Sequence, residues 1–135
     1  MNVVIMGCGR VGARVASLLD QNGHKITVVD THSRSFERLA HDFAGDTVIG
    51  TGIDEDILKM AGIEKADAFI AVTNHDNRNL MAAQVAQTIF KVPLCDCLWS
   101  PTDSGNLRNS FYDRVDLVLS QRNWNEWGGG KRLPG

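Results

Sequence analysis

Residues 3–12 of the chain read VVIMGCGRVG. The four apolar residues Val3–Met6, bounded by glycine, predict a strand that is buried on both faces of a parallel sheet. A helical segment follows, with one apolar face formed by Val11, Val15, Leu18 and Leu19. This stretch therefore predicts the strand–loop–helix unit that begins a doubly wound α/β fold.

Three glycines in this stretch form a G-x-G-x-x-G pattern, and each position requires glycine for a different physical reason. Gly7 allows the tight turn from strand to helix, Gly9 lets a pyrophosphate approach the backbone, and Gly12 lets the helix pack close to the strand. The start of the helix offers free N–H groups and the positive end of its dipole to phosphates. Arg10 either clamps the pyrophosphate or is a solvated surface residue. The loop therefore supplies six candidate cofactor contacts: Gly7, Cys8, Gly9, Arg10, Val11 and Gly12.

An acidic residue follows the second predicted strand, Ile26–Val29. Asp30 lies 18 residues after the last glycine of the loop, where a carboxylate accepts hydrogen bonds from ribose hydroxyls. The carboxylate would repel a 2′-phosphate, which favours NAD or an adenine nucleotide over NADP. Arg34 and Arg38 weaken that preference, because an arginine can accommodate the phosphate. Thr31, beside the carboxylate, is a further candidate contact.

Strand and helix segments alternate along the rest of the chain. Further strands are predicted at residues 48–49, 68–72, 94–99 and 115–119, and further helices at residues 36–43, 54–62, 76–90 and 106–112. The alternation predicts an α/β fold, a doubly wound parallel six-stranded Rossmann sheet of order 3-2-1-4-5-6 with helices on both faces. We expect one dinucleotide-binding domain over residues 1–121 and a loose tail or linker stump over residues 122–135.

Polar residues follow the fourth predicted strand, next to the point where the strand order reverses. Ligands of doubly wound sheets bind in that crevice, which makes Thr73, Asn74 and Asp76 candidate contacts. Asp76 alternatively only caps the long helix, and Asn79 points either into the site or into solvent. The turn after the third strand adds two more candidates, Thr51 and Gly52.

Composition excludes several classes of protein. The 135 residues are 43% hydrophobic and 22% charged, as in a soluble globular domain. A net charge of −2 argues against a nucleic-acid binder. The longest apolar run, Ala68–Val72, is too short to insert into a membrane, for which about 20 residues are needed. The first residues have no basic leader, so we expect a cytoplasmic protein with reduced thiols.

Cysteines and histidines do not predict a metal site. Cys95 and Cys97 stand two apart without a second pair, and Cys8 lies far away in the sequence, so we interpret all three as small hydrophobic residues. The histidines lack ligand spacing, and we expect them on the surface or in loops; they are His24, His32, His41 and His75.

Four segments together resemble the regulator of potassium conductance domain, also called the TrkA N-terminal domain. They read VIMGCGRVG at 4–12, GHKITVVD at 23–30, GIDEDILKMAGI at 52–63 and DAFIAVTNHDNRN at 67–79. The resemblance runs from Met1 to about Pro93. The family's acidic residue after the third-strand glycine is replaced by Thr51, and a second acidic position after Asp30 is filled by His32. The match is poor beyond Pro93, and these 135 residues do not include the family's usual C-terminal ligand-binding lobe, so we expect either a single-lobed member or part of a longer protein.

The resemblance implies a ligand sensor rather than an enzyme. Such domains bind NAD(H) or ATP, ADP or AMP without turnover, and they act on a membrane-embedded potassium transporter subunit. It also implies a homo-oligomer, a dimer or higher, that is cytoplasmic and peripheral to the inner membrane through its partner. Carried over to this chain, the glycine loop would hold the phosphates, Asp30 the ribose, and Thr73, Asp76 and Asn79 would match the segment after the fourth strand.

Two alternatives belong to other functional classes. The fold alone is compatible with an NAD-dependent oxidoreductase or its isolated cofactor domain, but Tyr112 has Asp116 rather than a lysine four residues on, so no Tyr/Lys proton-transfer pair is formed. A redox switch would use Cys8, whose position near a helix start could lower its pKa.

Overall fold

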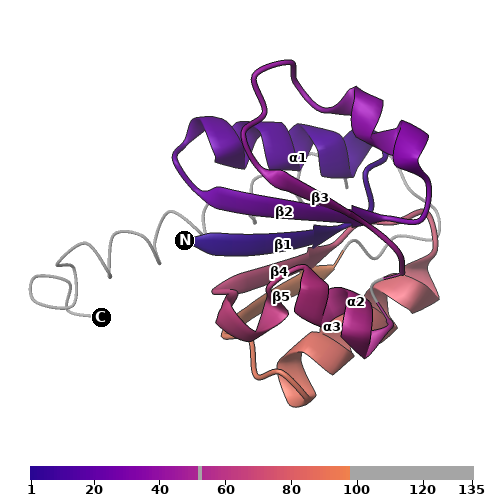
Figure 1. Ribbon diagram of the computed structural model, residues 1–135. Helices are drawn as coiled ribbons and strands as arrows, with labels where there is room; N and C mark the ends of the chain where they lie inside the picture. The colour runs from indigo at the N-terminus through magenta and orange to yellow at the C-terminus, as the bar shows by residue number, and fades with distance from the viewer. Residues whose placement is uncertain (52, 98–135) are drawn as a thin grey trace, which may run out of the picture. The chain divides into compact units, whose positions relative to one another are not determined.

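A computed structural model describes residues 1–51 and 53–97 of the chain (Figure 1). Five strands alternate with helical segments. In chain order they are β1 (Asn2–Met6), α1 (Arg10–Gln21), β2 (Lys25–Asp30), the 3-10 helix η1 (Ser33–Arg38), β3 (Asp46–Ile49), α2 (Glu55–Met60), the 3-10 helix η2 (Ile63–Lys65), β4 (Ala68–Ala71), α3 (Asp76–Thr88) and β5 (Leu94–Cys97).

The strands form one parallel sheet of order β3-β2-β1-β4-β5. This order confirms the α/β class and the predicted order for five strands. The predicted sixth strand at 115–119, the helix at 106–112 and the tail at 122–135 lie outside the described residues. The domain boundary at residue 121 therefore stays a prediction. Figure 1 shows α1 on one face of the sheet and α2 and α3 on the other, as a doubly wound fold requires.

The core lies on both faces of the two central strands. Val4 and Phe69 pack in a cluster with Leu58 and Ile63 from the α2–η2 segment, on the face that α2 and α3 cover. Since alternate strand residues face opposite sides, Val3 and Ile5 face α1. Leu58, Phe69 and Ile5 are all fully buried. The central strands are thus fixed from both sides, and the loops at their ends are held in place.

The first two α-helices begin and end at residues whose chemistry suits those positions. Gly23, after α1, and Gly62, after α2, adopt the left-handed conformation with φ of 90° and 85°. Asp54 precedes α2, and its carboxylate accepts a hydrogen bond of 2.9 Å from the Asp56 N–H. Among the described residues, no helix is long and apolar enough to cross a membrane.

The predicted helix over residues 36–43 is wrong. This part of the chain forms only the 3-10 helix η1, which ends at Arg38 and buries none of its residues. Phe36 and Leu39 are three residues apart, which suits one 3-10 turn, and both are only half-buried. Without a buried apolar stripe over two turns, an α-helix gains little from tertiary packing here.

The predicted apolar faces of the two longer helices are partly wrong. Leu18 on α1 is 44% exposed. For the helix at 76–90 the sequence predicts an apolar side formed by Leu80, Ala83, Val85, Ala86 and Ile89, but Leu80 is 40% exposed and Ile89, just after α3, is 51% exposed. Ala83 and Ala86 are buried as predicted, and Asn79 and Ala82 complete the inner face of α3. These residues keep helical spacing, but they are small or polar, so large apolar residues beside them were wrongly included in the predicted face.

Candidate functional site

A cleft of about 320 Å³ opens at the carboxyl ends of β1, β2, β3 and β4. We call it the carboxyl-end cleft. It is lined by the glycine loop, by the segments that follow β2, β3 and β4, by two residues of η1 and by one residue in the first turn of α3. The lining residues are Met6, Gly7, Gly9, Val29, Asp30, Thr31, His32, Ser35, Arg38, Gly50, Thr51, Val72, Thr73, Asn74, His75 and Arg78.

The three loop glycines have three different environments. Gly7 has φ of 107°, and a Cβ there would lie 3.0 Å from the Thr73 backbone nitrogen. A Cβ on Gly12 would overlap the carbonyl oxygen of Gly7, so α1 packs directly on the loop. A Cβ on Gly9, in contrast, would meet nothing within 4 Å. Gly7 and Gly12 therefore shape the loop, whereas Gly9 leaves open space in the cleft.

Asp30 fastens the loop to the end of β2. Its two carboxylate oxygens accept backbone N–H bonds of 2.8 Å each, from Cys8 and from His32. Its carbonyl oxygen accepts a third bond, of 2.9 Å, from the Gly50 N–H after β3. A carboxylate has about four lone-pair sites, so Asp30 retains acceptor capacity toward the cleft. One residue thus orders three of the segments that line the cleft.

Asn79 orders the segment after β4. This amide is fully buried, and its Oδ1 accepts bonds from the Thr73 N–H at 2.8 Å and the Thr73 hydroxyl at 2.6 Å. Its Nδ2 donates to the Thr73 carbonyl oxygen at 3.0 Å. Asn79 therefore points neither into solvent nor into the cleft, the two alternatives expected from the sequence. It holds Thr73, which does line the cleft.

The structure brings half of the predicted site residues to the carboxyl-end cleft. They are Gly7, Gly9, Asp30, Thr31, Thr51, Thr73 and Asn74. Four others are buried behind it: Cys8, Val11, Gly12 and Asn79. Arg10 is exposed at the start of α1 and does not line the cleft. Asp76 is the first residue of α3, and the N-cap position is held by His75, so the alternative role of Asp76 as the helix cap is not confirmed. Gly52 lies outside the described residues.

Several lining residues were not predicted as contacts, above all Arg38, His75 and Arg78. Arg38 had been noted only as able to tolerate a phosphate. Arg78 stands in the first turn of the helix that follows the Thr73 segment, which is the one sequence signal that could have found it. With two arginines against the single carboxylate of Asp30, the cleft favours anionic ligands.

The pKa of the Cys8 thiol is raised from 9.0 to about 11, mainly because the thiol is buried. The nearby Asp30 carboxylate contributes to this rise, and the Arg38 guanidinium partly opposes it. Cys8 has no exposed surface and is protonated at neutral pH. A redox switch needs an accessible thiolate, so these findings contradict the redox alternative for Cys8.

Histidine and cysteine placement agrees with the sequence except at one position. His24 is buried rather than exposed, and its Nδ1 lies 3.3 Å from the terminal ammonium of Met1. Cys95 and Cys97 share one face of β5 and are half-buried. In residues 1–51 and 53–97, no group of three or more His, Cys, Asp or Glu side chains is arranged to hold a metal.

Comparisons with known proteins agree with one another. The family model of the TrkA-N domain matches residues 3–99. The Trk system potassium uptake protein TrkA of Streptomyces coelicolor is 51% identical over 92 residues, which cover 68% of this chain and 41% of that protein. The protein of the same name from Halomonas elongata is 42% identical over 93 residues, 69% of this chain and 20% of that protein. The chain thus spans less than half the length of these relatives.

Two solved structures share the fold. The TrkA-N domain of the inner membrane protein ybaL from Escherichia coli has a TM-score of 0.66 and 17% identity, over 87% of this chain and 95% of that one. The Kef CTD of Shewanella denitrificans in its AMP bound form has a TM-score of 0.62 and 18% identity, over 91% and 93%. At such identities the likeness concerns the fold alone.

Proposed function

The chain belongs to the TrkA-N domain family, and from that membership we propose that it is the nucleotide-sensing regulatory domain of a potassium uptake system. Its relatives are named as Trk system potassium uptake proteins. Membership in the family supports the regulatory role, and the carboxyl-end cleft supports the nucleotide. The role is binding rather than catalysis: ligand is bound and released unchanged.

One observation carries the nucleotide proposal. The glycine loop is fixed on both sides, by the bond from Cys8 to Asp30 and by the packing of Gly12, yet Gly9 faces open space. This combination leaves a preformed gap over the start of α1, where free N–H groups and the helix dipole attract phosphate. The phosphates of NAD(H), or of ATP, ADP or AMP, would occupy that gap.

The other cleft residues would take the remaining parts of the ligand. Asp30 would accept hydrogen bonds from the ribose hydroxyls through its unused lone pairs. Arg38 and Arg78 would add charge toward the phosphates from η1 and α3. Thr73, held by Asn79, would present its segment to the ligand in one fixed position. Arg10, outside the cleft, is free to clamp a phosphate from the rim.

Regulation would follow from unequal binding to two states. A nucleotide shifts a conformational equilibrium only by its difference in affinity between the states. In the proposed assembly the domain forms a homodimer or a larger homo-oligomer that contacts a membrane-embedded potassium transporter subunit. It would therefore act in the cytoplasm and reach the inner membrane through that partner.

The first test is a thermal-shift and calorimetry series with NAD, NADH, NADP, ATP, ADP and AMP on the full chain. A ligand that binds only the native state raises the melting temperature. In Asp30→Asn we expect nucleotide binding to weaken by about 1.5–3 kcal/mol, the range for hydrogen bonds to a charged group. Asp42→Asn, an exposed carboxylate outside the cleft, is the matched control and should bind as the wild type does.

Two outcomes would contradict the proposal. If none of the six nucleotides stabilised the protein, the cleft would not be a nucleotide site. If Asp30→Asn and Asp42→Asn bound equally well, a nucleotide would bind elsewhere. Incubation with saturating NADH and a series of small carbonyl compounds tests the alternative of an oxidoreductase. A sensor leaves the NADH absorbance unchanged, whereas an oxidoreductase lowers it with its substrate.

A further inference from the structure

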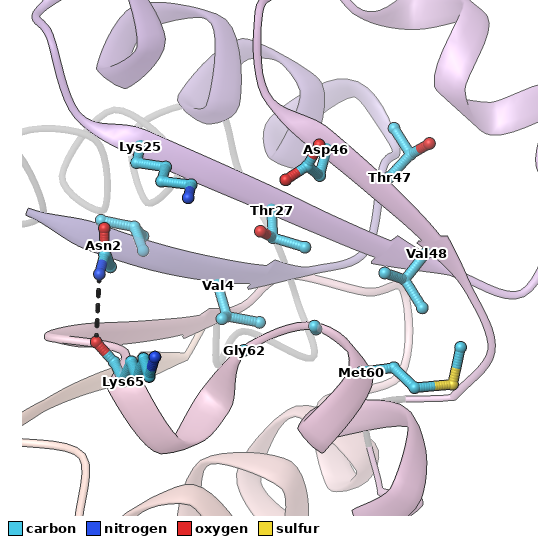
Figure 2. A pocket seen from close by; sticks show the side chains of 12 residues that line it. Asn2, Val4, Lys25, Thr27, Asp46, Thr47, Val48, Met60, Gly62 and Lys65 are labelled. Atoms are coloured by element: carbon cyan, nitrogen blue, oxygen red, sulfur yellow. Dashed lines mark hydrogen bonds between the residues drawn. The ribbon is translucent and has the colours of Figure 1, made fainter.

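A second cavity, of about 390 Å³, lies at the opposite end of the sheet from the carboxyl-end cleft. We call it the amino-end hollow. It is bounded by the first residues of β1, β2 and β3 on one side and by the turn between α2 and η2 on the other (Figure 2). Ala61 and Gly62 form part of this turn, and such small side chains leave the space between turn and sheet unfilled.

Strand register places polar side chains together in this hollow. Asn2 is paired with Lys25, and Thr27 is paired with Asp46, so the starts of three strands contribute to one face. Residues two apart along a strand share a face, which places Lys25 beside Thr27. Figure 2 shows Lys25 and Lys65 on opposite walls with Asn2 between them, and Asp46 at a distance along the same wall as Lys25.

These polar groups are not satisfied by one another. Within residues 1–51 and 53–97, the side chains of Lys25, Lys65 and Asp46 form no ion pair, and the Thr27 hydroxyl forms no hydrogen bond. The amide of Asn2 donates to the Lys65 carbonyl oxygen at 3.3 Å, which holds Lys65 at the rim. Two cations, one carboxylate and one hydroxyl therefore line one cavity without an ion pair or side-chain hydrogen bond to another described residue.

We propose that the amino-end hollow binds a small organic ligand with the charge pattern of an acidic amino acid. Lys25 and Lys65 would each bind one carboxylate by a charge-assisted hydrogen bond. Asp46 would bind the ligand's ammonium group. Val4 and Val48, which line the floor, would contact the methylene groups between the charges. Two anionic groups and one cationic group in the ligand match the two cations and one carboxylate of the hollow.

This site is separate from the proposed nucleotide site and does not depend on it. None of the residues that line the amino-end hollow lines the carboxyl-end cleft. The two cavities share only the strands that run between them. A ligand at the amino-end hollow would thus be a second small molecule for the same domain.

Amide chemical shifts of the full-length isotope-labelled chain test the site. The probes are L-glutamate, glutarate, γ-aminobutyrate and inorganic phosphate: glutarate lacks the ammonium group, and γ-aminobutyrate lacks one carboxylate. We expect L-glutamate to shift the amides of Val4 and Thr27 and to bind more tightly than the other three. In Asp46→Asn, L-glutamate should lose its advantage over glutarate.

Lysine variants identify the carboxylate partners. Lys25→Met and Lys65→Met keep most of the aliphatic stem, and each should weaken L-glutamate binding by about fivefold, the upper range for a solvent-exposed ion pair. Lys59→Met is the matched control, because Lys59 is exposed on α2 outside the hollow, and it should bind as the wild type does.

Three results would overturn the proposal. The first is the absence of shifts at Val4 and Thr27 with all four probes. The second is equal weakening by Lys59→Met and Lys25→Met, which would show only general charge attraction. The third is glutarate or phosphate binding at least as tightly as L-glutamate, which would exclude a ligand with an ammonium group.

Discussion

Two cavities of similar volume lie at the two ends of one parallel sheet, about 320 Å³ at the carboxyl ends and about 390 Å³ at the amino ends. The loops of the carboxyl-end cleft are held by side chains that are hydrogen-bonded within the protein, Asp30 in the cleft and Asn79 behind it. In the amino-end hollow, the charged side chains Lys25, Lys65 and Asp46 form no ion pair among the described residues. We infer that a rigid site needs supporting residues whose hydrogen bonds are already formed within the protein. A site whose polar groups lack protein partners gains those bonds only when its ligand binds.

The largest expected effects come from two glycines of the same loop. Gly12→Ala places a Cβ on the Gly7 carbonyl oxygen, and backbone cannot move aside, so we expect a loss of about 3 kcal/mol or more in unfolding free energy. Gly9→Ala meets nothing within 4 Å and should cost at most about 1 kcal/mol, the scale of a helix N-cap exchange.

Nucleotide binding should reveal an effect of Gly9→Ala that its stability does not show. Gly9→Ala occupies the gap over the start of α1 and should weaken nucleotide binding by about 1.4 kcal/mol, or tenfold, or more. Urea unfolding gives the stabilities and calorimetry the affinities. If Gly9→Ala unfolded as easily as Gly12→Ala, the gap would be a structural feature and not a ligand site.

The next largest effect on the unfolding free energy is expected at Asn79, the buried amide that holds Thr73 in the cleft. Asn79→Ala removes three hydrogen bonds to Thr73, and we expect a loss of about 2–3 kcal/mol in unfolding free energy. Asn77→Ala, on the exposed side of the same helix, should change it by less than about 0.5 kcal/mol. Equal losses from both variants in urea unfolding would mean that helix propensity, and not support of Thr73, explains the effect.

The buried thiol of Cys8 should make the unfolding free energy depend on pH. Because folding raises the pKa of Cys8 from 9.0 to about 11, its protonated form contributes stability that is fully present below pH 9. This contribution is lost as the pH rises through about 11, and it amounts to at most about 3 kcal/mol at 1.4 kcal/mol per pKa unit.

The measurement compares wild type with Cys8→Ala in urea unfolding at pH 7 and pH 10. The variant should lose less stability than the wild type over this interval. Parallel losses would show that Cys8 does not titrate with folding. Alkylation offers an independent check, since buried and protonated Cys8 should react more slowly than Cys95 and Cys97, which are half-buried.

The two ends of the sheet also differ in how well they could be predicted. The glycine loop and Asp30 were found because each signal is local: a residue type at a fixed spacing around a strand. The inner face of α3 was predicted only in part: Ala83 and Ala86 are buried as expected, but Leu80 is exposed and the buried Asn79 was missed because it is polar. Arg38 and Arg78 escaped as contacts because the direction of a long side chain depends on the tertiary fold.

The amino-end hollow carried no signal in the sequence at all. Lys25 and Asp46 each look like an ordinary charged residue at the start of a strand. Only the pairing register, Asn2 with Lys25 and Thr27 with Asp46, brings them to one face. Register between strands far apart in the chain follows from the packing of the whole sheet, which single residues do not reveal.

The smallest expected effect on the unfolding free energy comes from replacing threonine by valine. The same substitution can be made in the cleft and in the hollow, so the two ends of the sheet are compared directly. Thr73→Val in the cleft removes a hydroxyl that donates to Asn79 at 2.6 Å and accepts from the His75 N–H at 3.1 Å. We expect a loss of about 1–2 kcal/mol in unfolding free energy. Thr27→Val in the hollow removes a hydroxyl with no hydrogen bond among the described residues.

Thr27→Val should therefore change the unfolding free energy by less than about 0.5 kcal/mol, and the change should favour the folded state because valine suits a half-buried strand. Urea unfolding of the two variants side by side gives the difference directly. A cost at Thr27 equal to that at Thr73 would mean that the hydroxyl in the hollow is already satisfied in the free protein. In that case the Thr27 hydroxyl would already have a hydrogen-bond partner in the free protein, as Asp30 and Asn79 have. The proposed difference between the two ends of the sheet would then be wrong.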